Sequence, residues 1–172
     1  MNARTIEPGH DRAANIQKLG ELIREVDIAM LTTVAPSGHL VSRPLGTQEV
    51  EFDGDLWFAV ECDSGKVAEI EANPHVNVAY AAPARDVYVS VAGRASVVRD
   101  RSKIDQLWSP SMQAFFHGGK DDPNLCLIRV EADSAEYWDG HGKVLGKVLH
   151  LMLSAVTDEP ASLAENERID LR

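Results

Sequence analysis

The chain has 172 residues, of which 44% are hydrophobic, and its 17 Lys and Arg against 27 Asp and Glu give a formal net charge of −10. The length suits one domain, and the composition allows an ordinary apolar core. The acidic balance argues against nucleic-acid and anionic-membrane partners, because both require clustered cations, and no run of Lys or Arg is longer than two residues.

Three features bear on the cellular compartment. The most apolar tract, residues 144–156, is shorter than the roughly 20 residues of a bilayer crossing and is interrupted by charged and polar side chains. Residues 1–11 contain no apolar run, so no secretory signal peptide is expected. Cys62 and Cys126 stand far apart in apolar stretches and form neither a thiol-pair motif nor a four-thiolate zinc site. These features predict a reduced cytoplasmic protein.

The first half of the chain alternates between helical and strand periodicity. A Pro-Ser-Gly turn at residues 36–38 separates two β-branched segments, which predicts a hairpin. The dipeptide Asn73-Pro74 ends a short helix that begins near Ser64. The expected elements are a helix over residues 16–26, strands over residues 27–34, 39–47 and 56–60, and a helix over residues 64–73.

The second half adds three strands, over residues 76–82, 86–98 and 125–137. The strand over 86–98 has strict alternation, with valines predicted on one face. A helical turn is expected near Ile104, with Ser102 and Asp105 spaced as a capping box. Residues 144–153 have helical spacing, and the chain becomes polar after Asp158. About six strands with short helices between them favour an all-β barrel over a parallel α/β sheet.

Several catalytic signatures are missing. The glycines at 140, 142 and 146 do not form a dinucleotide-binding turn, and Gly142-Lys143 lacks the rest of a phosphate-binding loop. The six histidines form no close metal-ligand pair, and no serine stands in a nucleophile-elbow context. Hydrolase, nucleotide triphosphatase and metal-site hypotheses therefore have no sequence support.

Two cations are candidates for binding an anionic ligand. Arg43 lies on the second predicted strand, and Lys66 lies at the opening of a predicted helix, where free N–H groups and the helix dipole favour an anion. A phosphate would use both cations and the Ser64 hydroxyl. The alternative, which spacing leaves equally open, is that both cations pair on the surface with acids such as Glu61 or Glu69.

Most aromatic residues are expected to pack in the core. Trp138 differs because it is followed by Asp139-Gly140 at the end of a strand, which is a rim position. It is therefore the aromatic candidate for lining a planar ligand.

A series of short motifs runs in order from about residue 20 to residue 140. The motifs are Met30-Leu31-Thr32-Thr33-Val34, a turn with Gly38, Ser42-Arg43-Pro44-Leu45, Leu56-Trp57-Phe58, Ser64-Gly65-Lys66, Asn73-Pro74, Val89-Ser90-Val91-Ala92-Gly93, Asp100-Arg101, Leu107-Trp108, Asp122-Pro123 and Glu136-Tyr137-Trp138-Asp139. No single motif is specific, but their order and spacing resemble the pyridoxamine 5′-phosphate oxidase-like flavin-binding split barrels. The second half is similar to the bacterial general-stress-protein branch of that superfamily.

The resemblance implies a mainly β, six-stranded split β-barrel with short flanking helices, formed as a single domain over residues 1–172. The barrel core would span about residues 15–140, and residues 141–172 would be a helical or flexible tail. It also implies a homodimer with FMN bound in two clefts at the interface. By position, the residues implied to bind FMN are Arg43, Lys66 and Ser64 at the phosphate, Pro44, Leu45, Phe58, Ala59 and Val60 at the ring, and Trp138 from the partner subunit.

The chain departs from the pyridoxamine oxidases at two places. Those enzymes have two adjacent cations where this chain has Gly65-Lys66, and they follow their tryptophan with a basic segment that holds the substrate phosphate. Here Trp138 leads into Asp139-Gly140-His141-Gly142-Lys143. Oxidation of pyridoxamine phosphate is therefore not expected. The hypotheses are a flavin-dependent oxidoreductase of unknown substrate, a flavin-binding sensor or reservoir without turnover, and a deazaflavin-dependent reductase; no catalytic residue is assigned, and Tyr88 and Ser90 are contact candidates only.

Overall fold

The structure, a computed structural model, describes residues 4–5, 12–48, 50–140 and 165–171. The helices within these residues are α1 (Arg12–Ile23), α2 (Gly65–Ala72) and α3 (Arg101–Leu107), with the 3-10 turns η1 (Pro83–Arg85), η2 (Pro110–Ala114) and η3 (Gly119–Asp121). The strands are β1 (Arg4–Thr5), β2 (Ile28–Val34), β3 (Leu40–Gly46), β4 (Asp55–Glu61), β5 (His75–Ala82), β6 (Val87–Val98), β7 (Leu125–Asp139) and β8 (Glu165–Asp170).

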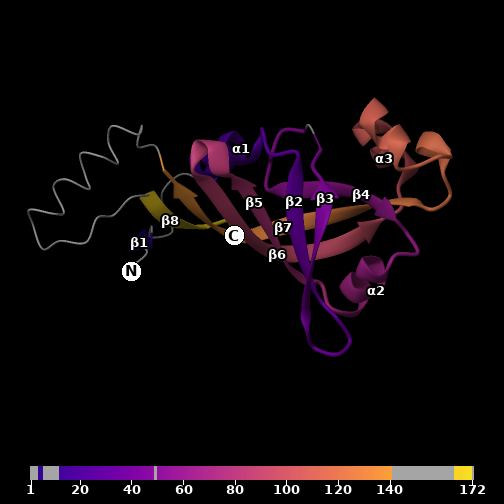
Figure 1. The fold of residues 1–172 in the computed structure, drawn as a ribbon, viewed down its shortest axis with the longest axis horizontal. Helices are drawn as coiled ribbons and strands as arrows, with labels where there is room; N and C mark the ends of the chain where they lie inside the picture. Colours follow the sequence, from indigo (N-terminus) through magenta and orange to yellow (C-terminus); the bar gives the residue numbers. More distant parts are fainter. Residues whose placement is uncertain (1–3, 6–11, 49, 141–164, 172) are drawn as a thin grey trace, which may run out of the picture.

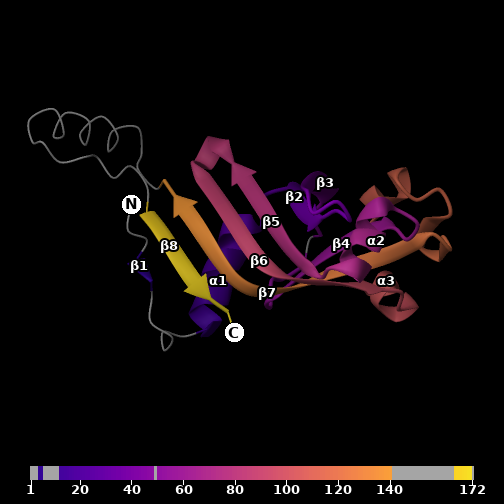
Figure 2. The ribbon, with the colours of Figure 1, turned by 90° about the horizontal axis from the view of Figure 1, so that it is seen from below.

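The strands form one curled sheet in the order β1-β8-β7-β6-β5-β2-β3, and β4 also pairs with β7. The long strand β7 pairs with β4 through its first half and with β8 through its second half. Figures 1 and 2 show the sheet curling, with α1 and α2 at separate ends of it. Among the described strands, β3 pairs only with β2 and β4 only with β7, so the sheet is a half-barrel with a split between β3 and β4. The predicted mainly β split-barrel class is confirmed.

Alternation of buried and exposed residues explains why these strands form and which face they bury. Along β6, Val87, Val89 and Val91 are buried, whereas Tyr88 on the opposite face is exposed. A fixed period of two places all inward residues in one apolar cluster with the inward side chains of the other strands. Burying these side chains is the main favourable contribution to the stability of the half-barrel.

A second, smaller core lies on the other face of β4 and β7. Ile104 and Leu107 of α3 pack there with Met112, Phe116 and Leu127. The neighbouring cation of Lys103 lies 4.5 Å from the centre of the Trp57 ring, a cation–π contact that covers this core from solvent. The segment from α3 to η3 is therefore anchored to the sheet by its own apolar face.

The structure confirms the six predicted strands, the helix before β2 and the helix between β4 and β5, with ends shifted by a few residues. It corrects the start of α3. The predicted capping box of Ser102 and Asp105 is wrong, because the N-cap is Asp100, whose carboxylate accepts a hydrogen bond of 2.9 Å from the Ser102 N–H. An acidic side chain here both caps the helix and complements its dipole.

The C-terminal tail also differs from expectation. Residues 141–172 are predicted to be helical or flexible, yet Glu165–Asp170 form β8, which pairs antiparallel with β7. Ile169 and Leu171 are buried in the main core, which accounts for the docking of this polar segment. The helix predicted over residues 144–153 lies outside the described residues.

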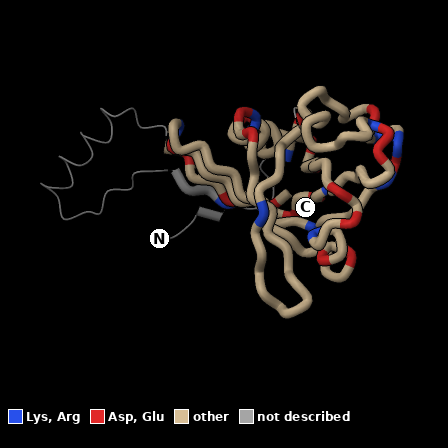
Figure 3. The backbone as a smooth tube through the Cα atoms, turned by 45° about the vertical axis from the view of Figure 1, so that its right-hand side comes forward, with Lys and Arg blue, Asp and Glu red and all other residues tan. Residues whose placement is uncertain are grey.

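Charges of both signs are interspersed in the described part of the chain. Figure 3 shows Lys and Arg positions beside Asp and Glu positions, most densely around α3. Within the described ranges, no helix is long and apolar enough to cross a bilayer, and no three His, Cys, Asp or Glu residues are grouped as metal ligands.

Gly93 marks an irregularity in the β6–β7 ladder, where the register shifts between Ala92 and Gly93. A Cβ at this position would collide with the backbone carbonyl oxygen of Glu131. Gly93→Ala is therefore expected to destabilise the fold by about 3 kcal/mol or more, because the contact is with backbone that cannot rotate away. Urea unfolding measures the loss. Gly46→Ala, whose added Cβ meets no atom within 4 Å, is the control, and equal stability of the two variants would contradict the prediction.

Candidate functional site

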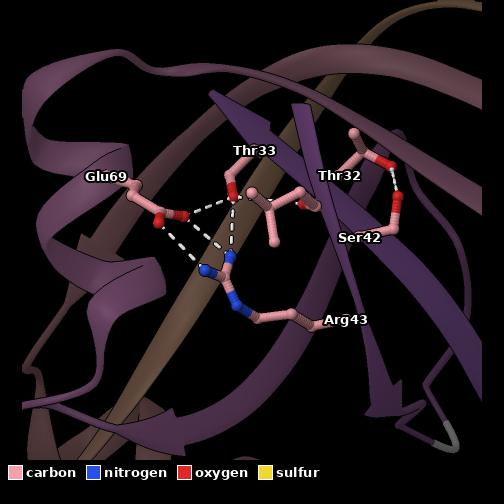
Figure 4. A network of polar contacts seen from close by, with 6 residues as sticks. Thr32, Thr33, Ser42, Arg43 and Glu69 are labelled. Carbon is pink, nitrogen blue, oxygen red and sulfur yellow. Dashed lines mark hydrogen bonds and ion pairs between the residues drawn. The ribbon is translucent and has the colours of Figure 1, made fainter. Parts of the chain in front are cut away.

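A buried polar network joins β2, β3 and α2 (Figure 4). Arg43 donates to both carboxylate oxygens of Glu69, from Nη1 to Oε2 at 2.7 Å and from Nη2 to Oε1 at 2.9 Å. The same Nη1 donates to Thr33 Oγ1 at 2.9 Å, and Thr33 Oγ1 donates to Glu69 Oε2 at 2.6 Å. The parallel two-bond geometry is the strong form of an arginine–carboxylate contact. It fixes the Arg43 side chain against α2.

Secondary structure explains why these three side chains meet. Thr33 and Arg43 both lie on the inward-facing side of the β2–β3 hairpin, where Thr33 is opposite Val41, two residues before Arg43. Glu69 lies on the face of α2 that also carries the buried Val67 and Ile70. Glu69 is only 8% exposed, so its charge needs a partner at that depth.

The network shifts the acid–base equilibria of its members. Hydrogen bonds from Arg43, and then from Thr33, hold the pKa of Glu69 below its usual value despite the opposing effect of burial. The reciprocal bond to Glu69 raises the pKa of Arg43. Glu69 is therefore ionised at neutral pH, and it neutralises one of the two cations that the sequence proposes for a phosphate.

The second cation and the serine lie at the start of the same helix. Lys66 is three residues before Glu69 on α2, and its charge also lowers the pKa of Glu69. Ser64 is the N-cap residue; its hydroxyl donates to the Glu61 carbonyl oxygen at 2.7 Å and accepts no hydrogen bond from the helix N–H groups. A Cβ added to Gly65 would meet no atom within 4 Å, so there is open space beside the first turn of α2.

Arg43 is tied to α2 through Glu69, and Ser64 and Lys66 lie at the start of the same helix. The first-turn N–H groups of a helix have no carbonyl partner within it, so they can donate to an anion. Lys66 and Arg43 are the candidate cations, and Glu61, Asp63 and Glu69 are acids of the same segment. The pairing of Arg43 with Glu69 also matches the alternative considered from the sequence, so Arg43 has a structural partner as well.

The residues expected beside a flavin ring are divided between two faces. The side chains of Leu45, Phe58 and Val60 point into the barrel core, and that of Phe58 is only 1% exposed. Pro44 is exposed on the outer face, and Ala59 packs against the smaller core. The side chains of Phe58 and Val60 are therefore covered, and what β4 offers to a ligand is the backbone of its unpaired edge.

Trp138 lies far from Lys66 within one chain. Trp138 on β7 pairs with Tyr88 on β6. Cys126, twelve residues earlier on β7, pairs with Val60 near the end of β4 that leads into α2. That separation is on the order of 40 Å of strand. Trp138 therefore does not contribute to the Arg43–Lys66 region of its own chain.

An open cavity of about 1240 Å³ lies elsewhere, between α1 and the segment from Thr47 to Phe58. Its walls carry charges of both signs, including Arg24 and Glu21, and the phenol of Tyr80, whose pKa is raised by burial. Of the residues proposed to bind FMN, only Phe58 lines it. The cavity contains none of the three residues proposed for the phosphate, Arg43, Ser64 and Lys66, so the α2 region is the better candidate site despite the size of this cavity.

Residues 14–161 match the family described as pyridoxamine 5′-phosphate oxidase like. The chain belongs to this family. Protein bli-3 of Neurospora crassa is 28% identical over 158 residues, which cover 86% of this chain and 76% of bli-3. The general stress FMN/FAD binding protein of Xanthomonas citri is 28% identical, with a TM-score of 0.66 over 77% of this chain and 94% of that chain.

A structure of a general stress protein 26 from Jannaschia sp. CCS1 has a TM-score of 0.74, covering 92% of this chain and 99% of that one, at 21% identity. This likeness confirms the fold. This family and its general-stress-protein branch are the ones predicted from the ordered motifs of the sequence.

Thr33 is not among the site residues predicted from the sequence, and Glu69 is predicted only as a surface partner of the cations. The alternation of β2 places Thr33 at an inward position where an apolar residue is expected. A polar residue at such a position indicates a buried hydrogen-bond partner. Which partner it meets depends on how α2 docks, and no local pattern contains that information.

Glu69→Gln is expected to lower the free energy of unfolding at pH 7 by about 1 to 2 kcal/mol, because the charge-assisted bonds to Arg43 are weakened. The pH dependence should change too. The pKa of Glu69 is lower in the folded chain than the usual value of about 4.3 in the unfolded chain. The stabilisation is therefore complete above that value and is lost as the pH falls through the folded pKa.

Urea unfolding between about pH 3 and pH 6 measures this difference, with a flatter acid limb expected for Glu69→Gln. The matched control is Glu71→Gln on the same helix, where the carboxylate pairs with Arg99 at an exposed position. If both variants keep the acid limb of the natural protein, Glu69 does not have the role described.

Proposed function

We propose that this chain is an FMN-binding general stress protein that acts as a homodimer in the cytoplasm and carries out flavin redox chemistry on a small molecule. The observation that carries the proposal is that Arg43 is tied through Glu69 to α2, the helix at whose start Ser64 and Lys66 lie. Membership of the pyridoxamine 5′-phosphate oxidase-like family supports it. So does the similarity to the Xanthomonas citri protein, which is described as FMN/FAD binding.

In this proposal the phosphate of FMN lies between Lys66 and the N–H groups at the start of α2. Arg43 donates from the N–H groups that it does not use on Glu69, since guanidinium has five donors. Arg43 would thus bridge a carboxylate and a phosphate. Glu69 limits the cost of keeping Arg43 half-buried when no anion is bound.

The ring would extend from there along the split edge of β4. Only one edge of β4 is paired, with β7. The peptide groups on its other edge, around Phe58, Ala59 and Val60, can form hydrogen bonds to the polar edge of a flavin, and Pro44 and Leu45 on β3 border the same split. Hydrogen bonds of this kind tune the redox potential of the cofactor.

The outer face of the sheet supports a homodimer. Cross-strand register places its apolar residues side by side, so that Met30 lies between Pro44 and Ala79, and Tyr88 lies between Ala81 and Trp138. Ile28, Met30 and Tyr88 are 55%, 39% and 42% exposed in the single chain. A contiguous apolar sheet face is typical of a protein interface. A second copy on this face is how Trp138 would reach a flavin bound by its partner.

FMN would supply two-electron redox chemistry, accepting hydride from a donor such as a reduced nicotinamide. This chain's residues would bind and orient it. Two other functions remain distinct outcomes: a sensor or reservoir binds FMN but does not oxidise reduced nicotinamide in the presence of an acceptor, and a deazaflavin enzyme prefers that cofactor in direct competition. The absorption spectrum of the purified protein, before and after reduced nicotinamide is added, separates the first outcome from turnover.

Lys66→Ala is expected to weaken FMN binding by roughly 1.5 to 3 kcal/mol, or about 10- to 150-fold in Kd, because a charge-assisted bond is lost. Arg43→Ala should act in the same direction. Since it also strips Glu69 of its main partner, the double variant Arg43→Ala/Glu69→Gln is the cleaner test of the phosphate contact. Flavin fluorescence quenching measures the Kd values.

Riboflavin, which lacks the phosphate, is the matched probe, and its weaker binding should be the same in all these variants. Arg129→Ala, on β7 in an ion pair with Asp55, is the control for loss of an arginine. If FMN affinity is unchanged in both Lys66→Ala and Arg43→Ala/Glu69→Gln, the phosphate lies elsewhere. If the protein binds neither flavin, the proposed function is wrong.

Met30→Lys is expected to convert the homodimer into monomers, because it introduces a charge into the centre of the apolar sheet face. Light scattering after size exclusion measures the mass. FMN binding should weaken in parallel, since each cleft is proposed to need both subunits. Phe115→Lys is the control, because Phe115 follows η2 and is 76% exposed away from the sheet face. A natural protein that is monomeric at micromolar concentration would contradict this part of the proposal.

A further inference from the structure

The two cysteines, which are distant in the sequence, are brought together where β4 ends and β7 begins. Cys126 on β7 is the register partner of Val60, and Cys62 follows Val60 by two residues. Residues two apart on a strand share a face, so both thiols belong to the same side of the β4–β7 ladder. Cys126 is buried in the main core, and Cys62 is partly buried and packs against that core. The sequence contains no thiol-pair motif, and it is the pairing of β4 with β7 that brings the two cysteines to one face.

Three hydrogen bonds hold the backbones on either side of this pair. The Cys62 N–H donates to the Asn124 carbonyl oxygen at 2.7 Å. The Asp63 N–H donates to Asn124 Oδ1 at 3.2 Å, and Asn124 Nδ2 donates to Asp63 Oδ1 at 2.9 Å. Because Asn124 is two residues before Cys126, these bonds fix the relative positions of the two backbone segments that carry the cysteines.

The two thiols differ in access. Cys126 is 0% exposed, and burial, followed by the nearby Cys62, raises the pKa of its thiol to about 12, so the thiol is protonated at neutral pH. Cys62 is half-buried and therefore open to a small solute. The cations of Arg99 and Lys66 act on this pair, and Glu71 is occupied in an ion pair with Arg99. A partly exposed thiol beside cations is the environment in which cysteines react with oxidants.

We propose that Cys62 and Cys126 form a reversible disulfide within one chain when the protein meets a peroxide, with Cys62 reacting first. The Cys62 sulfur attacks the peroxide O–O bond and becomes a sulfenic acid, and the other oxygen leaves as water. The Cys126 sulfur then attacks the Cys62 sulfur, the S–O bond breaks, and the hydroxyl leaves with the Cys126 proton as a second water. Two thiols are oxidised by two electrons, and one hydrogen peroxide is reduced to two waters.

This site stands independently of flavin binding, although the bond would form two residues before Ser64. It would tie the end of β4 to the start of β7 and so fix the turn that leads into α2. Diagonal neighbours on paired strands lie about 7–8 Å apart, at the upper limit of the separation that a disulfide spans. A closing movement where β4 ends would therefore accompany the bond.

The test uses the full chain, reduced and then freed of reductant. Hydrogen peroxide is added, the remaining thiols are alkylated under denaturing conditions, and peptides are mapped by mass spectrometry without reduction. The expected result is a linked pair of peptides containing Cys62 and Cys126, with free thiols falling from two per chain to none and returning on treatment with dithiothreitol. This measurement needs no variant.

Two variants test the order of reaction. Cys126→Ser should accumulate a dimedone-reactive sulfenic acid on Cys62, and Cys62→Ser should keep Cys126 as a free thiol over the same time. Three results would overturn the proposal: both thiols surviving peroxide in the natural chain, Cys62 passing to higher oxidation states without a linked peptide, or linkage only between chains, seen as a dimer on a non-reducing gel.

Discussion

The ion pair between Arg43 and Glu69 is the tie on which the arrangement of the candidate site depends. The half-barrel is open between β3 and β4, since these strands form no ladder with each other. Arg43 lies on β3, and Glu69 lies on α2, which follows β4 after a three-residue turn. Two short hydrogen bonds between them therefore connect the two sides of the split. Thr33 and the buried Val67 and Ile70 also hold α2 against the β2–β3 hairpin, but the Arg43–Glu69 bonds join α2 to β3 itself and so set where Arg43 lies relative to the helix.

Electrostatics explains how an acidic chain can carry such a region. The formal net charge is −10, but charges separated by more than the Debye length of about 8 Å are largely screened at physiological ionic strength. A bound anion responds to its nearest donors, which would be Lys66, the free N–H groups of Arg43 and the first-turn N–H groups of α2. The carboxylate also limits the cost of keeping Arg43 half-buried, because an unpaired guanidinium at that depth would lose hydration without compensation. Glu69 thus makes a cationic region compatible with a stable fold.

Local patterns were enough to predict the strands, the hairpin and the two helices around the barrel, because strict alternation, as in β6, is decided by burial on one face. Local patterns failed to predict structure that depends on contacts between segments distant in the sequence. β8 is mostly polar, and it is a strand because Ile169 and Leu171 reach the core beside β7. The N-cap of α3 is Asp100 and not Ser102, although aspartate and serine are both favourable N-cap residues. The partnership of Thr33 with Glu69, and that of Cys62 with Cys126, join segments far apart in sequence, which no periodicity records.

The separation of Trp138 from α2 constrains the proposed function in a way that composition and motifs do not. Trp138 lies on β7, and α2 follows β4, which pairs with the opposite end of the same strand. Because β7 is paired on both edges for most of its length, its ladders would have to break before Trp138 and α2 came together within one chain. Either Trp138 has no part in binding the flavin, or a second chain supplies it. The apolar outer face, which carries Trp138 beside Tyr88, favours the second alternative. Dimer formation and the role of Trp138 are therefore one hypothesis: a monomeric protein that binds FMN would exclude Trp138 from the site and leave Arg43, Lys66 and Ser64 to account for the affinity.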